Sequence, residues 1–165
     1  MLLMTPINII TLFVGEEKAD EDFGRNSNGA LGRDGCIYAL IDGRVLKIHT
    51  VSNYHGYVGD FDDDCGAGWG DEILGIDDCI YWPPYNARRT LKYDPHTDLT
   101  SLVGDDFGTQ LFKWVGGTLA SDKVVYCFPT CANQVLAIDP IGEFLATTKV
   151  VMQDDLQCHI DLKYT

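Results

Sequence analysis

The stretch that decides the fold is "GDFDDDCGAGWGDEILGIDDCIYWPPYNARRTLKYDPHTDLTSLV" at residues 59–103. The following 45 residues, "GDDFGTQLFKWVGGTLASDKVVYCFPTCANQVLAIDPIGEFLATT" (104–148), repeat it without a gap, with eleven identical positions. The identical positions include a tryptophan, an aspartate, a tyrosine and an Asp-Pro pair: Trp69/Trp114, Asp77/Asp122, Tyr81/Tyr126 and Asp94-Pro95/Asp139-Pro140. A fixed period of this length predicts a repeat protein, in which each copy forms the same supersecondary unit.

A weaker copy precedes these two. Its Leu31, Asp34, Tyr38 and Leu46 fall on the same template after a two-residue deletion beside Ile41. The start of the chain matches as well, because "TLFVG" (11–15) overlays "HGYVG" (55–59) and "TSLVG" (100–104). We therefore interpret the apolar N-terminus as the last strand of one more unit.

Each copy contains four short segments rich in β-formers and separated by turn residues. In the third copy we expect strands at 113–120, 124–128, 134–139 and 144–150. Four strands per repeat of 40–50 residues are typical of β-propeller blades, and a closed ring has four to eight blades. The predicted fold is all-β: three four-stranded antiparallel blades plus an extra N-terminal strand, which make a partial or open propeller.

Two segments resemble known propeller repeats. The sequences "DDCIYWPPYNARRTLKYDPHTD" (77–98) and "DKVVYCFPTCANQVLAIDPIGE" (122–143) are similar to blades of the YVTN, NHL and Kelch type. Those blades carry a Gly-rich inner strand, an Ile/Val-Tyr second strand and a third strand that ends in Asp-Pro. The resemblance covers residues 7–150. The predicted division is one domain, 1–165, with these parts: a strand of a preceding blade at 7–15, blade one at 26–59, blade two at 66–104, blade three at 111–151 and a tail at 152–165.

Charge and composition narrow the choice of partners. The formal charge of −13 argues against a nucleic-acid partner, because the phosphate backbone would be repelled. The N-terminus is too short an apolar stretch to span a membrane and lacks the basic region of a signal peptide. Six cysteines in 165 residues do not make a dense disulfide framework. We expect a cytoplasmic protein that contacts a protein partner or associates with itself.

The repeat register brings three pairs of inner-strand residues to equivalent positions, namely Asn28-Gly29, Asp71-Glu72 and Gly116-Gly117. Resemblance to calcium-dependent propeller lactonases, which place Glu, Asn and Asp side chains in the central channel, makes Asn28, Asp71 and Glu72 the candidate ligand-binding residues. The alternative is that glycine serves close strand approach here and the polar residues face water.

The acidic connection "DFDDD" (60–64) offers Asp60, Asp62 and Asp64 as metal ligands, because oxygen ligands at alternate positions suit calcium. The alternative, which we favour, is solvated loop charge. The sequence therefore predicts no cofactor, with calcium as the second choice, and it identifies no catalytic residue.

Two further repeated residue types have a packing interpretation. Trp69 and Trp114 occupy one repeat position, which favours inter-blade packing over ligand stacking. Cys36 and Cys79 occupy another, where a cysteine serves as a small strand hydrophobe.

Because propellers host enzymes, scaffolds and receptors alike, the fold alone decides little about activity. The function we predict from sequence is a non-enzymatic propeller module for protein interaction or assembly. The alternatives are a calcium-dependent, lactonase-like hydrolase completed by oligomerisation, and an incomplete propeller without a role of its own.

Overall fold

The computed structural model describes residues 28–41, 43–52, 54–59 and 68–142. In this part of the chain every regular element is a β-strand, and the strands form three antiparallel sheets. The predicted all-β, open repeat fold is confirmed. The described residues contain no helix of the length and apolarity needed to cross a membrane.

Each sheet pairs its strands in chain order, and we call the sheets blades one, two and three. Blade one consists of β1 (Ala30–Leu31), β2 (Cys36–Ile41), β3 (Arg44–His49) and β4 (His55–Val58). Blade two consists of β5 (Ile73–Leu74), β6 (Ile80–Trp82), β7 (Thr90–Asp94) and β8 (Leu99–Val103). Blade three contains β9 (Trp114–Leu119), β10 (Val125–Pro129) and β11 (Leu136–Ile138) within the described residues.

Several predicted segments lie outside the described residues: the N-terminal strand at 7–15, the fourth strand of blade three at 144–150 and the tail at 152–165. The exact blade boundaries and the single-domain division stay predictions.

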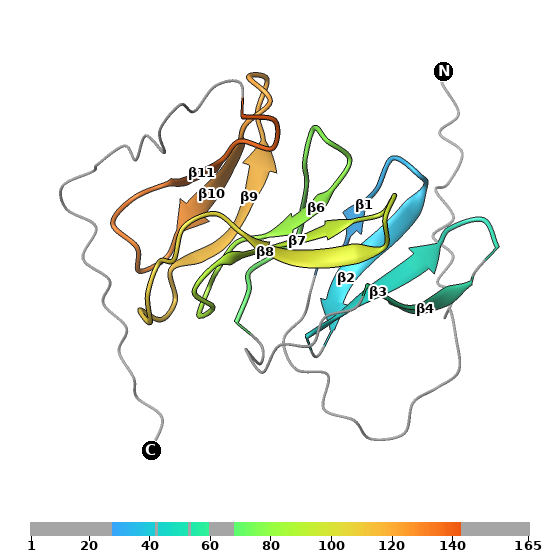
Figure 1. The fold of residues 1–165 in the computed structure, drawn as a ribbon, viewed down its shortest axis with the longest axis horizontal. Helices are drawn as coiled ribbons and strands as arrows, with labels where there is room; N and C mark the ends of the chain where they lie inside the picture. The colour runs from blue at the N-terminus through green and yellow to red at the C-terminus, as the bar shows by residue number, and fades with distance from the viewer. Residues whose placement is uncertain (1–27, 42, 53, 60–67, 143–165) are drawn as a thin grey trace, which may run out of the picture.

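The blades stand side by side in series and do not close into a ring (Figure 1). Strand β5 contacts both β1 and β9, so the first strands of the three blades are neighbours. We call these three the inner strands. Residues just before or within them converge on one region, although they are about 45 residues apart in sequence.

One hydrogen-bonded unit recurs at the turn between the first two strands of every blade. The carboxylates of Asp34, Asp77 and Asp122 accept from the hydroxyl of the tyrosine four residues on, at 2.7, 2.8 and 2.9 Å. Each also accepts from the backbone N–H two residues on. The residue after each aspartate has positive φ, at Gly35, Asp78 and Lys123. These contacts explain why Asp and Tyr recur in the repeat: together they fix the turn.

The two repeated tryptophans are pinned within their own blades. The indole N–H of Trp69 donates to the Arg89 carbonyl at 2.9 Å, and that of Trp114 donates to the Gln134 carbonyl at 2.8 Å. Both side chains are buried. A buried indole with its donor satisfied is a packing element, so each tryptophan closes the loop between the second and third strands of its blade.

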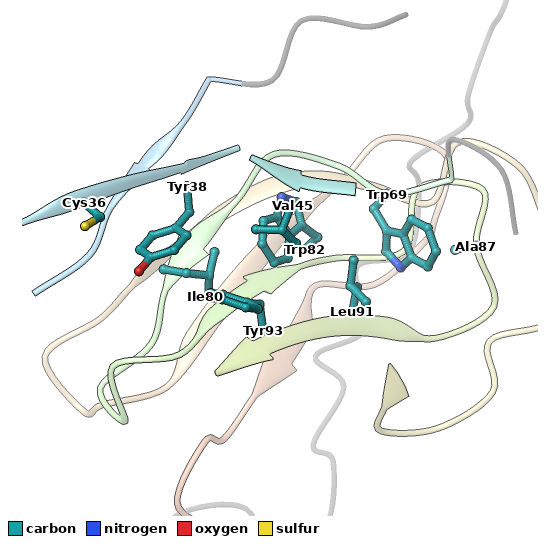
Figure 2. Close-up of a cluster of buried hydrophobic side chains, with 9 residues drawn as sticks. All are labelled: Cys36, Tyr38, Val45, Trp69, Ile80, Trp82, Ala87, Leu91 and Tyr93. Carbon is teal, nitrogen blue, oxygen red and sulfur yellow. The ribbon is translucent and has the colours of Figure 1, made fainter. Parts of the chain in front are cut away.

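Two buried clusters hold the blades together. The first joins blades one and two and is drawn in Figure 2: Cys36, Tyr38, Val45, Trp69, Ile80, Trp82, Ala87, Leu91 and Tyr93. The second joins blades two and three: Ile73, Trp114, Val125, Cys127, Ala132 and Leu136. Buried apolar area is the main favourable contribution to folding, so packing between neighbouring blades stabilises the fold.

Candidate functional site

The three predicted ligand-binding residues meet at the inner strands. Asn28 precedes β1, and Asp71 and Glu72 precede β5. The Asn28 side-chain amide donates to Asp71 Oδ2 at 2.8 Å, which links blade one to blade two. We call Asn28, Asp71 and Glu72 the inner-strand cluster. Its role in binding stays a prediction.

Backbone contacts on both sides position Asp71. The Gly70 N–H donates to the Pro83 carbonyl at 2.8 Å, and the Asp71 N–H donates to the Val115 carbonyl on β9. A Cβ at Gly70 would lie 2.2 Å from the Val115 oxygen, so only glycine fits this approach. Asp71 is therefore held between blades two and three while its carboxylate reaches blade one.

A glycine on β9 lets blade three approach Asp71 closely. A Cβ at Gly116 would lie 3.2 Å from the Asp71 Cβ, which is tighter than most real contacts. Gly116 is equivalent in the repeat to Asp71 and to Asn28. The three equivalent positions thus come together across three blades, and two of them carry polar side chains.

Glu72 is fixed by the core. Its Oε2 accepts from the indole N–H of Trp82 at 3.2 Å, and Trp82 is fully buried. A Cβ at Gly29 would lie 3.9 Å from the other carboxylate oxygen, so blade one also lies against Glu72. This carboxylate has little freedom to move.

Burial raises the pKa of Asp71 above its usual value of 3.8, and the hydrogen bond from Asn28 opposes part of that rise. A carboxylate with a raised pKa is a stronger proton acceptor than an ordinary aspartate. The cluster therefore combines a proton-accepting carboxylate, a fixed second carboxylate and an amide.

The predicted metal ligands Asp60, Asp62 and Asp64 lie outside the described residues. Within the described ranges, no group of three or more His, Cys, Asp or Glu side chains is placed to hold a metal ion. The calcium assignment therefore stays untested.

Three of the cysteines are buried, unpaired thiols: Cys36, Cys79 and Cys127. Burial raises the pKa of Cys79 and of Cys127 to about 12. A thiol with so high a pKa supplies almost no thiolate at neutral pH, so these residues serve packing.

Sequence reasoning missed one charged group beside the repeated turn. In blade two, Lys92 Nζ lies 2.9 Å from Asp77 Oδ2, which also accepts from Tyr81. Blade one repeats the arrangement, with Lys47 Nζ 3.2 Å from Asp34 Oδ2. The spacing of Lys47 and Lys92 in the repeat is the signal that could have found it. Because two blades share the group, we assign it to the scaffold.

Burial alone would raise the pKa of Asp34, yet the hydrogen bonds from Tyr38, the Cys36 N–H and Lys47 together lower it to about 2. In blade two, burial alone would likewise raise the pKa of Asp77, but its hydrogen bonds with Lys92, Tyr81 and Cys79 together lower that pKa. A carboxylate with a lowered pKa is a poor proton acceptor. The pKa of Asp71 is therefore shifted in the opposite direction to the pKa values of Asp34 and Asp77 in the repeated turns.

No family model matches the chain, and no curated protein matches it. Solved structures, however, match this chain. A catalytically inactive virginiamycin B lyase from Staphylococcus aureus with quinupristin has a TM-score of 0.57 and 12% identity, over 79% of this chain and 41% of that chain. The selenomethionine-substituted virginiamycin B lyase from the same organism has a TM-score of 0.58 and 12% identity, over 78% and 41%. A streptogramin B lyase has a TM-score of 0.57 and 15% identity, over 79% and 41%.

These structures are propellers, and the likeness shows the fold. The chain is a partial β-propeller. It matches about 41% of the length of each of these neighbours. Whether its blades belong to the YVTN, NHL or Kelch type stays a prediction.

The comparison corrects the function predicted from sequence. The non-enzymatic interaction module is overturned: the solved structures that this chain resembles are named lyases, and at 12–15% identity over 41% of their length they support a propeller fold and no specific function. The comparison supports neither of its two alternatives, the calcium-dependent hydrolase and the fragment without a role, because it supports a propeller fold and no specific function. The physical reason for the error is that strand periodicity and net charge describe the blade scaffold, whereas activity depends on a few inner side chains.

Proposed function

We propose that this chain forms three blades of an enzyme-type propeller that binds a small organic molecule at the inner-strand cluster. The reaction class we propose is elimination, with Asp71 as the proton acceptor. The observation that carries the proposal is the 2.8 Å contact from Asn28 to Asp71, which joins two blades at their inner strands.

The chemistry of the cluster suits this reaction. In an elimination a base takes a proton from carbon, the electrons of that bond form a double bond, and the leaving group departs with its own electron pair. Burial raises the pKa of Asp71, which makes it a stronger base. The side-chain amide of Asn28 has two N–H donors, of which one holds Asp71. The second is available to a ligand oxygen.

The fixed surroundings support orientation of a ligand. Glu72 is bound to Trp82, and Asp71 is clamped between Pro83 and Val115 through its own N–H and that of Gly70. Positioning groups that need not reorganise during the reaction contribute to catalysis. The lyase names of the neighbouring structures supply the reaction class to be tested and carry no further detail to this chain.

The test uses the whole chain and quinupristin, the compound present in one neighbouring structure. Conversion is followed by liquid chromatography with mass spectrometry. Asp71→Asn should lower the rate at least about 100-fold, because general-base catalysis contributes that much or more. The matched control is Asp78→Asn, which makes the same charge change at a turn with φ of 64°, a conformation that asparagine accepts.

Two outcomes would overturn the proposal. The first is that folded wild-type chain converts none of the compound. The second is that Asp71→Asn and Asp78→Asn convert it as fast as the wild type does. A rate that rises with pH as Asp71 loses its proton would further support the assignment.

The remaining expectations from sequence stay predictions. They are a protein partner or self-association, no nucleic-acid partner and no membrane association. Calcium binding is tested separately by thermal unfolding with and without millimolar calcium. An ion that binds the folded chain raises the melting temperature of the protein.

A further inference from the structure

The interface between blades one and two is filled by an aromatic pair. The rings of Tyr38 on β2 and Tyr93 on β7 lie with centroids 5.3 Å apart, and their exposed fractions are 0% and 1% (Figure 2). The Tyr93 hydroxyl donates to Asp98 Oδ1 at 2.9 Å, and the Gly59 N–H donates to the same oxygen at 3.1 Å. A Cβ at Gly59 would lie 3.3 Å from the Tyr93 ring. The Tyr93 ring therefore occupies the space between Tyr38 and Gly59 at this interface.

The interface between blades two and three has the same frame without the ring. The repeat register sets Tyr81 in the place of Tyr38, Gly104 in the place of Gly59 and Ile138 in the place of Tyr93. Tyr81, Gly104 and Ile138 all line a cavity of about 330 Å³. Apart from its two chain neighbours, no described residue lies within 4 Å of a Cβ built at Gly104. The space that the Tyr93 ring occupies in one interface is thus open in the next.

The lining of the cavity limits what it can bind. Thr90, which is 2% exposed, brings a hydroxyl to the position where blade one has Val45. Lys92 also lines the cavity, but its ammonium is paired with Asp77. Asp105 and Asp139 add two carboxylates to the lining. These charges disfavour an anion, while the tyrosine face and the aliphatic residues favour an apolar ring.

We infer that this cavity binds a neutral, planar aromatic molecule of about the size of phenol. The ring packs on Tyr81 as Tyr93 packs on Tyr38, and its polar substituent hydrogen-bonds to Thr90. The volume lies at the low end of the range for small-molecule sites. Smaller apolar cavities, of about 150 Å³, already bind benzene. This site is separate from the inner-strand cluster and does not depend on the proposed reaction.

The probe is p-cresol, which has the shape of a tyrosine side chain. We expect saturable binding to the whole chain by calorimetry, with a dissociation constant of about 1 mM or tighter. The methyl signals of Ile138 should move upfield in NMR spectra, because they come to lie near the ring face. Ile138→Tyr, which restores the residue of the closed interface, should weaken p-cresol binding at least about 10-fold and keep or raise the melting temperature.

A second variant tests the polar contact and does not depend on the behaviour of Ile138→Tyr. Thr90→Val, the blade-one residue, should weaken p-cresol about 5- to 10-fold and leave toluene binding unchanged, because only p-cresol loses a hydrogen bond. Asp71→Asn should leave p-cresol binding intact, which distinguishes this site from the inner-strand cluster.

Three results would overturn the inference. One is the absence of p-cresol binding at 10 mM, about ten times the expected dissociation constant. Another is binding without any shift of the Ile138 methyl signals. The third is equal p-cresol affinity in the wild type and a folded Ile138→Tyr variant.

Discussion

The two interfaces between blades are built on the same frame, and the side chain that matters most for their difference is the one at Tyr93 and Ile138. Between blades one and two, Tyr93 packs on Tyr38 and is fully buried. Between blades two and three, Ile138 stands in the place of Tyr93 and faces a cavity. The copies of the repeat therefore share their hydrogen-bonded turns, but they differ in how tightly neighbouring blades pack.

The largest expected effect contrasts truncations at these equivalent positions. Tyr93→Ala removes a fully buried ring and its hydrogen bond to Asp98, so it should lower the free energy of unfolding by about 3–5 kcal/mol. Ile138→Ala removes a smaller, partly exposed side chain beside an existing cavity, and should cost about 1 kcal/mol. Urea unfolding monitored by tryptophan fluorescence measures both. Equal costs would contradict the claim that only the first interface is closed.

The second expected effect contrasts the repeated turns of blades two and three. Asp77→Ala leaves the partly buried Lys92 ammonium and the Tyr81 hydroxyl without their acceptor, which should cost about 2–3 kcal/mol. In blade three, Ala137 replaces the lysine, so Asp122→Ala should cost only about 1 kcal/mol. Chemical denaturation of both variants checks this. A larger loss in blade three than in blade two would show that the lysine contributes nothing.

The smallest expected effect concerns pH, and its sign differs between the two kinds of aspartate. The pKa of Asp34 is lowered to about 2 in the folded chain, so its stabilisation is complete above pH 4 and is lost as pH falls towards 2. The pKa of Asp71 is raised, so its contribution is favourable at low pH and is lost as pH rises through the folded value.

Melting temperatures from pH 2 to pH 7 test these signs. Relative to the wild type, Asp34→Asn should melt with a weaker dependence on pH below 4. Asp71→Asn should gain stability relative to the wild type as pH rises above 4. The assignment is wrong if either variant changes the slope in the opposite direction.

Much of the fold was predictable because it rests on local signals. The strands expected at 113–120, 124–128 and 134–139 correspond to β9, β10 and β11, since turn residues and β-formers mark their limits. The recurring aspartate and tyrosine were visible in the repeat, but their mutual hydrogen bond was not. The repeat shows that two residues belong to one unit, whereas their side-chain geometry depends on the turn between them.

The inner-strand cluster was predictable in position and not in chemistry. The register aligned Asn28 with Asp71, and the structure joins them by a hydrogen bond. That Trp82 fixes Glu72 depends on the antiparallel register of β5 against β6 and on the side-chain geometry across it, which sequence spacing does not report. The cavity beside Ile138 could not be predicted from sequence, because it is formed by residues of two blades that meet only in the folded chain.

The most direct test of the central claim, that Asn28 and Asp71 meet to form a proton-accepting site, is an NMR pH titration of the Asn28 side-chain amide. We expect this signal to shift with pH with a midpoint above 3.8, because its N–H donates to the Asp71 carboxylate, whose pKa is raised. The amide of Asn86, whose oxygen accepts from the Phe112 N–H, serves as the control. A flat Asn28 signal, or a midpoint at or below 3.8, would contradict the account.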